Sequence, residues 1–141
     1  EPRVAFLSYS TFGNPEGKWL ENIRGAVKVL DGRQVGFEYE GEMAPDLALN
    51  HEMQRRFYPF SRLNGPANIL IMPNLDAANI AYQMIKSLAN ALPVGPILIG
   101  PARPAHILTP GVTARGILNM TAVAAVEAQE RAGRAQPTLF G

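Results

Sequence analysis

Three short stretches carry residue types that could hold an anionic ligand: SYSTFGNPEG, PNLDAAN and HILTPGVTARG. Each follows an apolar segment, and each leads toward a helical pattern. Hydroxyl groups and the free amides at a helix N-terminus donate to negative oxygens, so such loops suit a phosphate, a carboxylate or an acyl oxygen. The candidate ligand contacts are Ser10, Thr11, Asp76, Asn79, Thr109 and Arg115.

The same residues also have plain structural interpretations. Ser10 and Thr11 are ordinary turn residues. Asp76 is typical of a helix N-cap, and Asn79 would lie in the first turn of the same helix. Their types alone therefore leave ligand contact and local capping open, with capping favoured for Asp76.

Several other chemistries find little support. The chain has no cysteine, which excludes a thiolate nucleophile, a disulfide framework and a zinc–thiolate site. His51 and His106 lack acidic neighbours at ligand spacing, so we expect surface or hydrogen-bonded histidines and no metal site. The sequence contains no Walker motif, no GxGxxG motif and no nucleophile elbow. We therefore assign no catalytic residue.

Charged residues gather in two further places. EGEMAPD brings Glu40, Glu42 and Asp46 near one another. Acid–base chemistry is conceivable there, although negative charges before a helix usually complement its dipole. Arg62, in the irregular stretch FYPFSRLNGPAN, is expected to form a salt bridge or to reach a partner.

Composition limits the class of protein. With 141 residues and 47% hydrophobic content, the chain fits one globular domain. Thirteen basic and 12 acidic residues give a formal charge of +1, so no nucleic-acid or anionic-membrane surface is expected. The apolar runs are too short to span a membrane. A cytoplasmic location is the default expectation, and the start EPRVAFLS suggests a piece of a longer protein.

Strands and helices are expected to alternate. Uninterrupted apolar runs at 4–7, 69–72 and 97–99 are typical of strands covered on both faces, and residues 35–39 predict another strand. The predicted helices are 19–30 ending at Gly32, 45 to about 56 with Pro45 in the first turn, 76–91 with Asp76 as N-cap, and 114 to about 132 with Thr113 as N-cap. This order predicts an α/β domain with a mostly parallel sheet.

The chain resembles the second half of the phosphate acetyl/butyryltransferase family. The matching segments are RVAFLSYSTFGNP, EGEMAPDLAL, FSRLNGPANILIMPNLDAANIAYQMIKSL, VGPILIGPARPAHILTPGVT and ILNMTAVAAVEAQ, which cover nearly the whole chain in order. More narrowly, the chain resembles a subgroup in which this domain is fused behind a malic enzyme. Two segments carry this resemblance, SRLNGPANILIMPNLDAANIAY and ILTPGVTARGILNMTA.

The resemblance implies a three-layer α/β sandwich, one lobe of a two-lobed fold similar to isocitrate and isopropylmalate dehydrogenases, with CoA between the lobes. Residues 1–105 would form one lobe, 106–135 the terminal helix region and 136–141 a tail. The resemblance also implies a homo-oligomer, at least a dimer.

Four positions depart from the family pattern in ways that concern its chemistry. Active family members carry a Ser-Arg pair and then an acidic residue where this chain has Thr109, Pro110 and Gly116. Pro110 has neither a guanidinium nor a backbone N–H, and Gly116 has no carboxylate that could act on a CoA thiol. Arg115 begins a helix and is not expected to replace the arginine. The family's Asp-Gly-Glu-Leu-Gln is EGEMA here, ending at Ala44.

The resemblance, with these losses, predicts a non-catalytic regulatory and oligomerisation domain of an NADP-dependent malic enzyme, sensing acetyl-CoA or a related anionic ligand. NADP and a divalent metal would belong to the malic enzyme part, which converts malate to pyruvate and CO2, and no cofactor is expected in this segment. One alternative is an active transferase that exchanges acyl groups between CoA and phosphate. Another is a purely structural dimerisation lobe.

Overall fold

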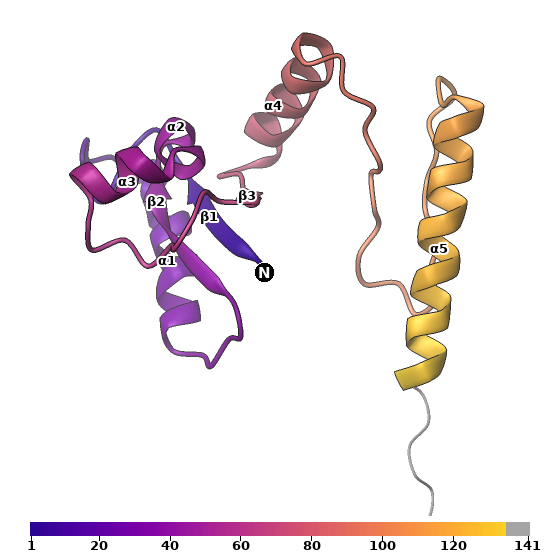
Figure 1. Cartoon of the computed structure of the whole chain (residues 1–141), viewed down its shortest axis with the longest axis horizontal. Helices are drawn as coiled ribbons and strands as arrows, with labels where there is room; N and C mark the ends of the chain where they lie inside the picture. The colour runs from indigo at the N-terminus through magenta and orange to yellow at the C-terminus, as the bar shows by residue number, and fades with distance from the viewer. Residues whose placement is uncertain (135–141) are drawn as a thin grey trace, which may run out of the picture. The chain divides into compact units, whose positions relative to one another are not determined.

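The computed structural model describes residues 1–134, apart from the side chains of Trp19 and Arg134. Its backbone divides into two units, Glu1–Met84 and Ile85–Gly141 (Figure 1). The first unit holds the sheet and the helices around it, and the second holds the longest helix. Within residues 1–134, no helix combines the length and apolarity needed to cross a membrane.

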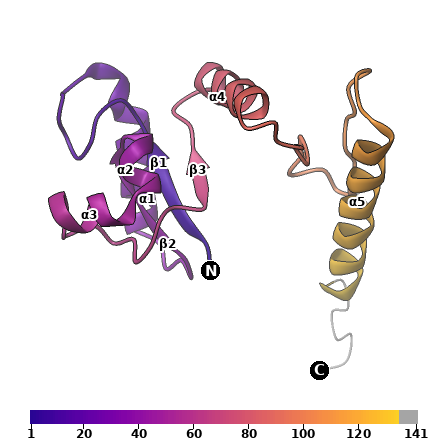
Figure 2. The same ribbon diagram turned by 45° about the horizontal axis from the view of Figure 1, so that its top comes forward.

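A parallel sheet of three strands organises the first unit. The strands are β1 (Arg3–Leu7), β2 (Glu38–Met43) and β3 (Ile69–Ile71), in the order β2-β1-β3 (Figure 2). Both neighbours run parallel to β1. The strands predicted at 4–7 and 69–72 are confirmed, as is the α/β class with a parallel sheet.

The strand predicted at 35–39 was placed too early. Pairing between β1 and β2 begins with Arg3 opposite Glu38, and Glu38 N donates to Pro2 O. Residues 35–37 precede this point and belong to no strand. Sequence alternation marked the apolar residues but could not show where the neighbouring strand starts.

Apolar residues cover both faces of β1, which explains its uninterrupted apolar run. Val4 and Phe6 pack with Ile23 and Val27 of α1 (Glu21–Asp31). Ala5 and Leu7 alternate to the opposite face. There they pack in a second cluster whose other buried members are Met43, Leu47, Ala48, Leu63 and Ala67.

The helix α1 follows a short 3-10 turn, η1 (Lys18–Leu20), and ends at Gly32 as predicted. The single helix predicted from Pro45 to about residue 56 is wrong, because two helices replace it. They are α2 (Pro45–Leu49) and α3 (His51–Phe57), and Pro45 does begin the first. Asn50 between them is extended, and its side chain accepts a hydrogen bond from Met53 N, so it starts the second helix.

The N-cap of α4 (Leu75–Leu88) is a further correction. Asn74 Oδ1 accepts a 2.8 Å hydrogen bond from Ala77 N, whereas Asp76 lies inside the first turn. The N-cap of α5 (Ala114–Arg134) is confirmed, since Thr113 Oγ1 accepts a 3.1 Å hydrogen bond from Gly116 N. Residues 135–141, which include the predicted tail, lie outside the described residues.

The strand predicted at 97–99 is wrong for the described part of the chain. These residues belong to no strand, and Ile99 is 90% exposed. Leu98 N donates to the side-chain Nδ1 of His106, at 3.3 Å, where a strand would donate to a neighbouring backbone carbonyl. An apolar run favours a strand only where a second backbone lies beside it.

Candidate functional site

The carboxyl ends of all three strands meet at one edge of the sheet, because the strands are parallel. Ligands of open parallel sheets bind at this edge. Residues 8–14, which follow β1 and are called the edge loop below, begin here. Ala44 after β2 and the segment from β3 to the start of α4 begin at the same edge. Two of the three predicted ligand stretches therefore follow neighbouring strands.

Ser10, the first predicted ligand contact, is completely buried. Its hydroxyl donates a 3.0 Å hydrogen bond to Glu42 Oε1, and its backbone N–H donates to Ser8 Oγ. In this structure the side chain of Ser10 is thus engaged by the protein.

Glu42 is the centre of the polar contacts at this edge. Only 3% of its side chain is exposed, and its carboxylate accepts hydrogen bonds from Ser10, from Gly13 N at 3.0 Å and from two nitrogens of Arg24, both at 2.7 Å. Hydrogen bonding from the Arg24 guanidinium holds the pKa of Glu42 below its ordinary value, although burial opposes this. Sequence reasoning noticed Glu42 but not Arg24.

Thr11 lies beside Ala44 at the start of α2. Its Oγ1 accepts a 3.1 Å hydrogen bond from Ala44 N, which leaves the hydroxyl hydrogen for another acceptor. Phe12 N donates to Glu42 O, and Thr11 exchanges backbone hydrogen bonds with Asn14. These bonds close a tight loop in which Phe12 and Gly13 take positive φ angles of 46° and 96°.

A cavity of about 370 Å³ opens between the edge loop and the two short helices. Its walls are mainly apolar and aromatic, with two hydroxyls and one carboxylate; it is lined by Thr11, Ala44, Asp46, Leu47, Met53, Phe57 and Tyr58. The carboxylate of Asp46 would repel a phosphate. The cavity therefore suits an uncharged part of a ligand, particularly one with a hydrogen-bond donor.

Asp76 and Asn79 are exposed in the first turns of α4. Because Asn74 performs the capping, the carboxylate of Asp76 is not used as the cap acceptor. Ser10, Thr11, Asp76 and Asn79 belong to the unit Glu1–Met84, and Thr109 and Arg115 to the unit Ile85–Gly141.

In the second unit, Thr109 begins a turn. Its carbonyl accepts a 3.0 Å hydrogen bond from Val112 N, so Pro110 and Gly111 are the two central residues. Proline followed by glycine suits such a turn. Arg115 is exposed on the first turn of α5. A side chain at Gly116 would meet Val112, because a Cβ there would lie 2.7 Å from Val112 Cγ2.

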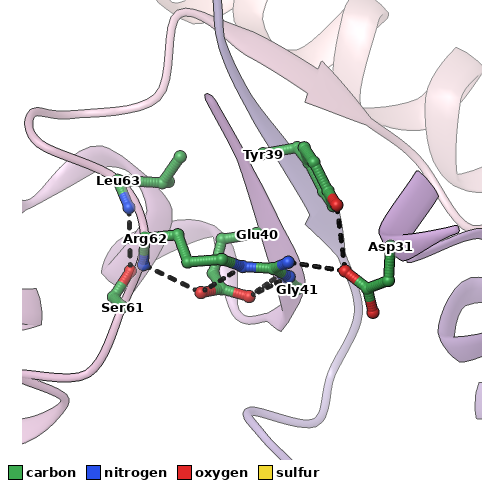
Figure 3. A network of polar contacts seen from close by, with 7 residues as sticks. All are labelled: Asp31, Tyr39, Glu40, Gly41, Ser61, Arg62 and Leu63. Atoms are coloured by element: carbon green, nitrogen blue, oxygen red, sulfur yellow. Dashed lines mark hydrogen bonds and ion pairs between the residues drawn. The ribbon is translucent and has the colours of Figure 1, made fainter. Parts of the chain in front are cut away.

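Arg62 forms a separate network in the first unit, shown in Figure 3. Its side chain donates to Glu40 and Asp31, its backbone N–H donates to Glu40, and it lies over the ring of Tyr39. Hydrogen bonds to Glu40 raise the pKa of Arg62. The predicted salt bridge of Arg62 is confirmed, and the network braces the segment after α3.

The hydrogen-bonded role expected for the histidines is seen at His106. His106 Nδ1 accepts from Leu98 N, and its Nε2 lies 3.2 Å from Glu127 Oε2, so the predicted hydrogen-bonded histidine is confirmed for this residue. Among residues 1–134, no three side chains of His, Cys, Asp or Glu are grouped as metal ligands.

Comparison with known proteins places these features in a family. The family model described as phosphate acetyl/butaryl transferase matches residues 1–125. The chain is 45% identical to an NADP-dependent malic enzyme of Rhizobium meliloti, covering 90% of this chain and 17% of that protein. It is 34% identical to a phosphate acetyltransferase of Clostridium acetobutylicum, covering 92% of this chain and 39% of that protein.

Solved structures agree. A phosphotransacetylase from Streptococcus pyogenes matches with a TM-score of 0.83 and 30% identity, covering 92% of this chain and 39% of that one. The EutD phosphotransacetylase from Staphylococcus aureus matches with a TM-score of 0.81 and 29% identity, covering 90% of this chain and 40% of that one. With 125 of its residues matched by the family model, the chain belongs to the phosphate acetyl/butaryl transferase family.

Proposed function

We propose that this chain is a non-catalytic, acetyl-CoA-binding and oligomerisation part of an NADP-dependent malic enzyme. The chain spans only 17% of the length of the malic enzymes of Rhizobium meliloti and Haemophilus influenzae that it matches, so the activity of the whole protein is part of the proposal. Malic enzymes match at 41–45% identity, compared with 34% and 39% for two phosphate acetyltransferases.

The observation that carries the proposal is the turn at residues 109–112. Pro110 stands where active family members place an arginine, and as a central turn residue it supplies neither a guanidinium nor an N–H donor. Gly116 supplies no carboxylate, and Val112 occupies the space that a side chain there would enter. Acyl transfer needs charge stabilisation in the transition state, whereas effector binding does not.

The edge loop and the cavity beside it support binding of an adenylated, partly apolar molecule. Thr11 can donate to an anionic or carbonyl oxygen, and the walls formed by Phe57 and Tyr58 suit a planar or apolar group. Acetyl-CoA offers both kinds of chemistry. Asp76 and Asn79 are further proposed contacts on the first unit, and Thr109 and Arg115 are proposed contacts on the second.

Assembly is the second part of the proposal. Large apolar side chains are exposed on α4 and α5, including Ile80, Leu88, Leu118 and Val126, and such faces commonly bury against another subunit. We propose a homo-oligomer, at least a dimer, in which this chain forms one lobe of a two-lobed fold similar to isocitrate and isopropylmalate dehydrogenases.

Titration calorimetry of the full-length protein with acetyl-CoA tests the proposal, alongside malate turnover with and without acetyl-CoA. We expect saturable binding and a change in malate turnover. Absence of both would reject acetyl-CoA sensing, and an unchanged dimer in light scattering would then favour the purely structural lobe. CoA and acetate, added separately, serve as ligand controls.

An active transferase is the second candidate, and membership of the transferase family favours it. It predicts that phosphate attacks the thioester of acetyl-CoA, which forms acetyl phosphate and releases CoA. Turnover equal to that of buffer at saturating acetyl-CoA and phosphate would reject it, and robust turnover would reject the non-catalytic proposal.

A further inference from the structure

We infer that Arg24 and Glu42 are positioning residues, which hold the edge loop in the conformation that presents Thr11 to the ligand. Ser10 belongs with them, acting through Glu42 and not touching the ligand itself. This inference rests on the proposed binding function, because it names how that site is held in shape.

The carboxylate of Glu42 ties the edge loop on both sides of Thr11. Its Oε1 accepts from Ser10 Oγ, which precedes Thr11, and from Gly13 N, which follows it, both at 3.0 Å. The backbone carbonyl of the same residue accepts from Phe12 N at 2.9 Å. Three residues of the loop, Ser10, Phe12 and Gly13, are thus fixed to one residue of β2.

Arg24 compensates the buried negative charge of Glu42. It comes from α1, and its Nε and Nη2 bind both oxygens of Glu42 in a two-pronged pair. A carboxylate that is 3% exposed is strongly destabilising without a partner. Removing Arg24 would leave a buried negative charge held only by Ser10 and Gly13, which favours protonation or movement of the loop.

The donors of the edge loop are divided between the protein and the ligand. The Ser10 hydroxyl and the Gly13 N–H are both directed at Glu42. The Thr11 hydroxyl accepts from Ala44 N and keeps its hydrogen. Thr11 is also the loop residue that lines the 370 Å³ cavity, and of these three residues it is the one that contacts the ligand.

The first unit contains a closely matched control pair. Arg62 binds Glu40 with a similar geometry, and the exposed fractions of the two side chains are 42% and 6%, compared with 43% and 3% for Arg24 and Glu42. Glu40, however, holds the backbone of Arg62 and not the edge loop. A variant at Arg62 therefore loses the same kind of interaction away from the proposed site.

The experiment compares Arg24→Met with Arg62→Met in the full-length protein, using hydrogen exchange and acetyl-CoA titration. In Arg24→Met we expect the amides of residues 11–14 to exchange faster while those of β1 stay protected, and affinity for acetyl-CoA to fall by roughly tenfold or more. In Arg62→Met both the loop exchange and the affinity should remain as in the parent protein. Arg24→Lys keeps the positive charge but cannot form the two-pronged pair. Its loop exchange and its affinity for acetyl-CoA should therefore lie between those of the parent protein and Arg24→Met.

Equal losses of affinity in the Arg24 and Arg62 variants, or unchanged loop exchange in Arg24→Met, would overturn the inference. If Arg24→Met fails to fold, Arg24→Lys and Ser10→Ala provide the same comparison. Ser10→Ala should speed loop exchange, whereas Thr11→Val should weaken binding without doing so, and the reverse pattern would make Ser10 the ligand contact. If the parent protein binds no acetyl-CoA, the proposed function fails, while loop exchange still tests the positioning role.

Discussion

Arg24 and Glu42 meet through two hydrogen bonds of 2.7 Å, from Nε to Oε2 and from Nη2 to Oε1. The pair joins α1 to the end of β2 and places a buried carboxylate under the loop that follows β1. This one ion pair therefore links α1, β2 and the edge loop. Its contribution to the stability of the first unit can be measured by varying the pH.

Stability of the first unit should fall in acid. The pKa of Glu42 is held below its ordinary value of 4.5, chiefly by hydrogen bonding from Arg24. Arg62 lowers the pKa of Asp31 in the same direction, and Asn64 lowers that of Glu38. A lowered pKa in the folded state gives stability that is fully present above the unfolded value and is lost as the pH falls through the folded value.

We therefore expect the unfolding free energy to decline below about pH 4.5, and to decline less steeply in Glu42→Gln. At neutral pH the substitution should cost about 2 kcal/mol, because the buried side chain at position 42 loses its charge-assisted hydrogen bonds from Arg24. Urea unfolding at several pH values measures this. Glu52→Gln on the exposed side of α3 is the control, and identical pH slopes for the two variants would contradict the prediction.

Gln54 provides a second prediction, with the opposite pH dependence. It is 1% exposed, and its Nε2 donates to Leu47 O at 2.8 Å and to Ala48 O at 3.1 Å, at the end of α2. Gln54→Leu keeps most of the volume but removes both bonds, and should cost about 1 to 2 kcal/mol.

In Gln54→Glu, a carboxylate would face the same two carbonyl oxygens at neutral pH. The cost should exceed that of Gln54→Leu and should shrink as the pH is lowered, because only the protonated acid can donate. Urea unfolding at pH 7 and pH 5, both above the range in which Glu42 loses its charge, tests this. A cost of Gln54→Glu that does not change with pH would show that these carbonyls are reached by water.

The sequence predicts the central strand β1 better than it predicts the segments between elements and the residues at which helices start. The run at 4–7 is apolar throughout because α1 and α2 cover opposite faces of β1, a situation that the pattern itself encodes. The run at 97–99 looks the same but forms no strand, because composition does not show whether a second backbone lies alongside. Asn50 and Asn74 both cap helices. The sequence pattern instead predicted one continuous helix through Asn50, and it predicted Asp76 as the N-cap in place of Asn74.

The location of the candidate site was predictable from the sequence, but its network of hydrogen bonds and ion pairs was not. Strand–loop–helix order placed Ser10 and Thr11 at the carboxyl edge of the sheet. The partner of Glu42 is 18 residues away in sequence, on a helix whose charged face looked ordinary. Only the β1–α1–β2 crossover brings Arg24 to Glu42, so no local pattern contained this pair.

Thr113 and Thr121 provide a matched comparison on α5. Thr113 Oγ1 accepts from Gly116 N and so caps the helix, whereas Thr121 Oγ1 donates to Ile117 O within it. Thr113→Ala should destabilise the helix by about 1 kcal/mol. Thr121→Ala should be neutral or slightly stabilising, because alanine is the better helix former. Hydrogen exchange of residues 114–120 checks both, and equal effects would argue against the capping role.

Gly116 and Val112 should behave as a coupled pair. A Cβ at position 116 would lie 2.7 Å from Val112 Cγ2, closer than such atoms approach in folded proteins. Gly116→Ala should therefore destabilise the chain by roughly 1 kcal/mol in the presence of Val112. In a Val112→Ala background the same change should stabilise by up to about 1 kcal/mol, since alanine favours helix over glycine.

A double-mutant cycle of thermal unfolding measures the coupling between these two positions. If Gly116→Ala has the same sign in both backgrounds, the contact does not constrain position 116. If the sign reverses, an acidic residue at 116 also requires a smaller residue at 112, since every side chain except glycine carries the same Cβ. The missing carboxylate would then be held absent by a second residue, and a single substitution could not restore it without strain.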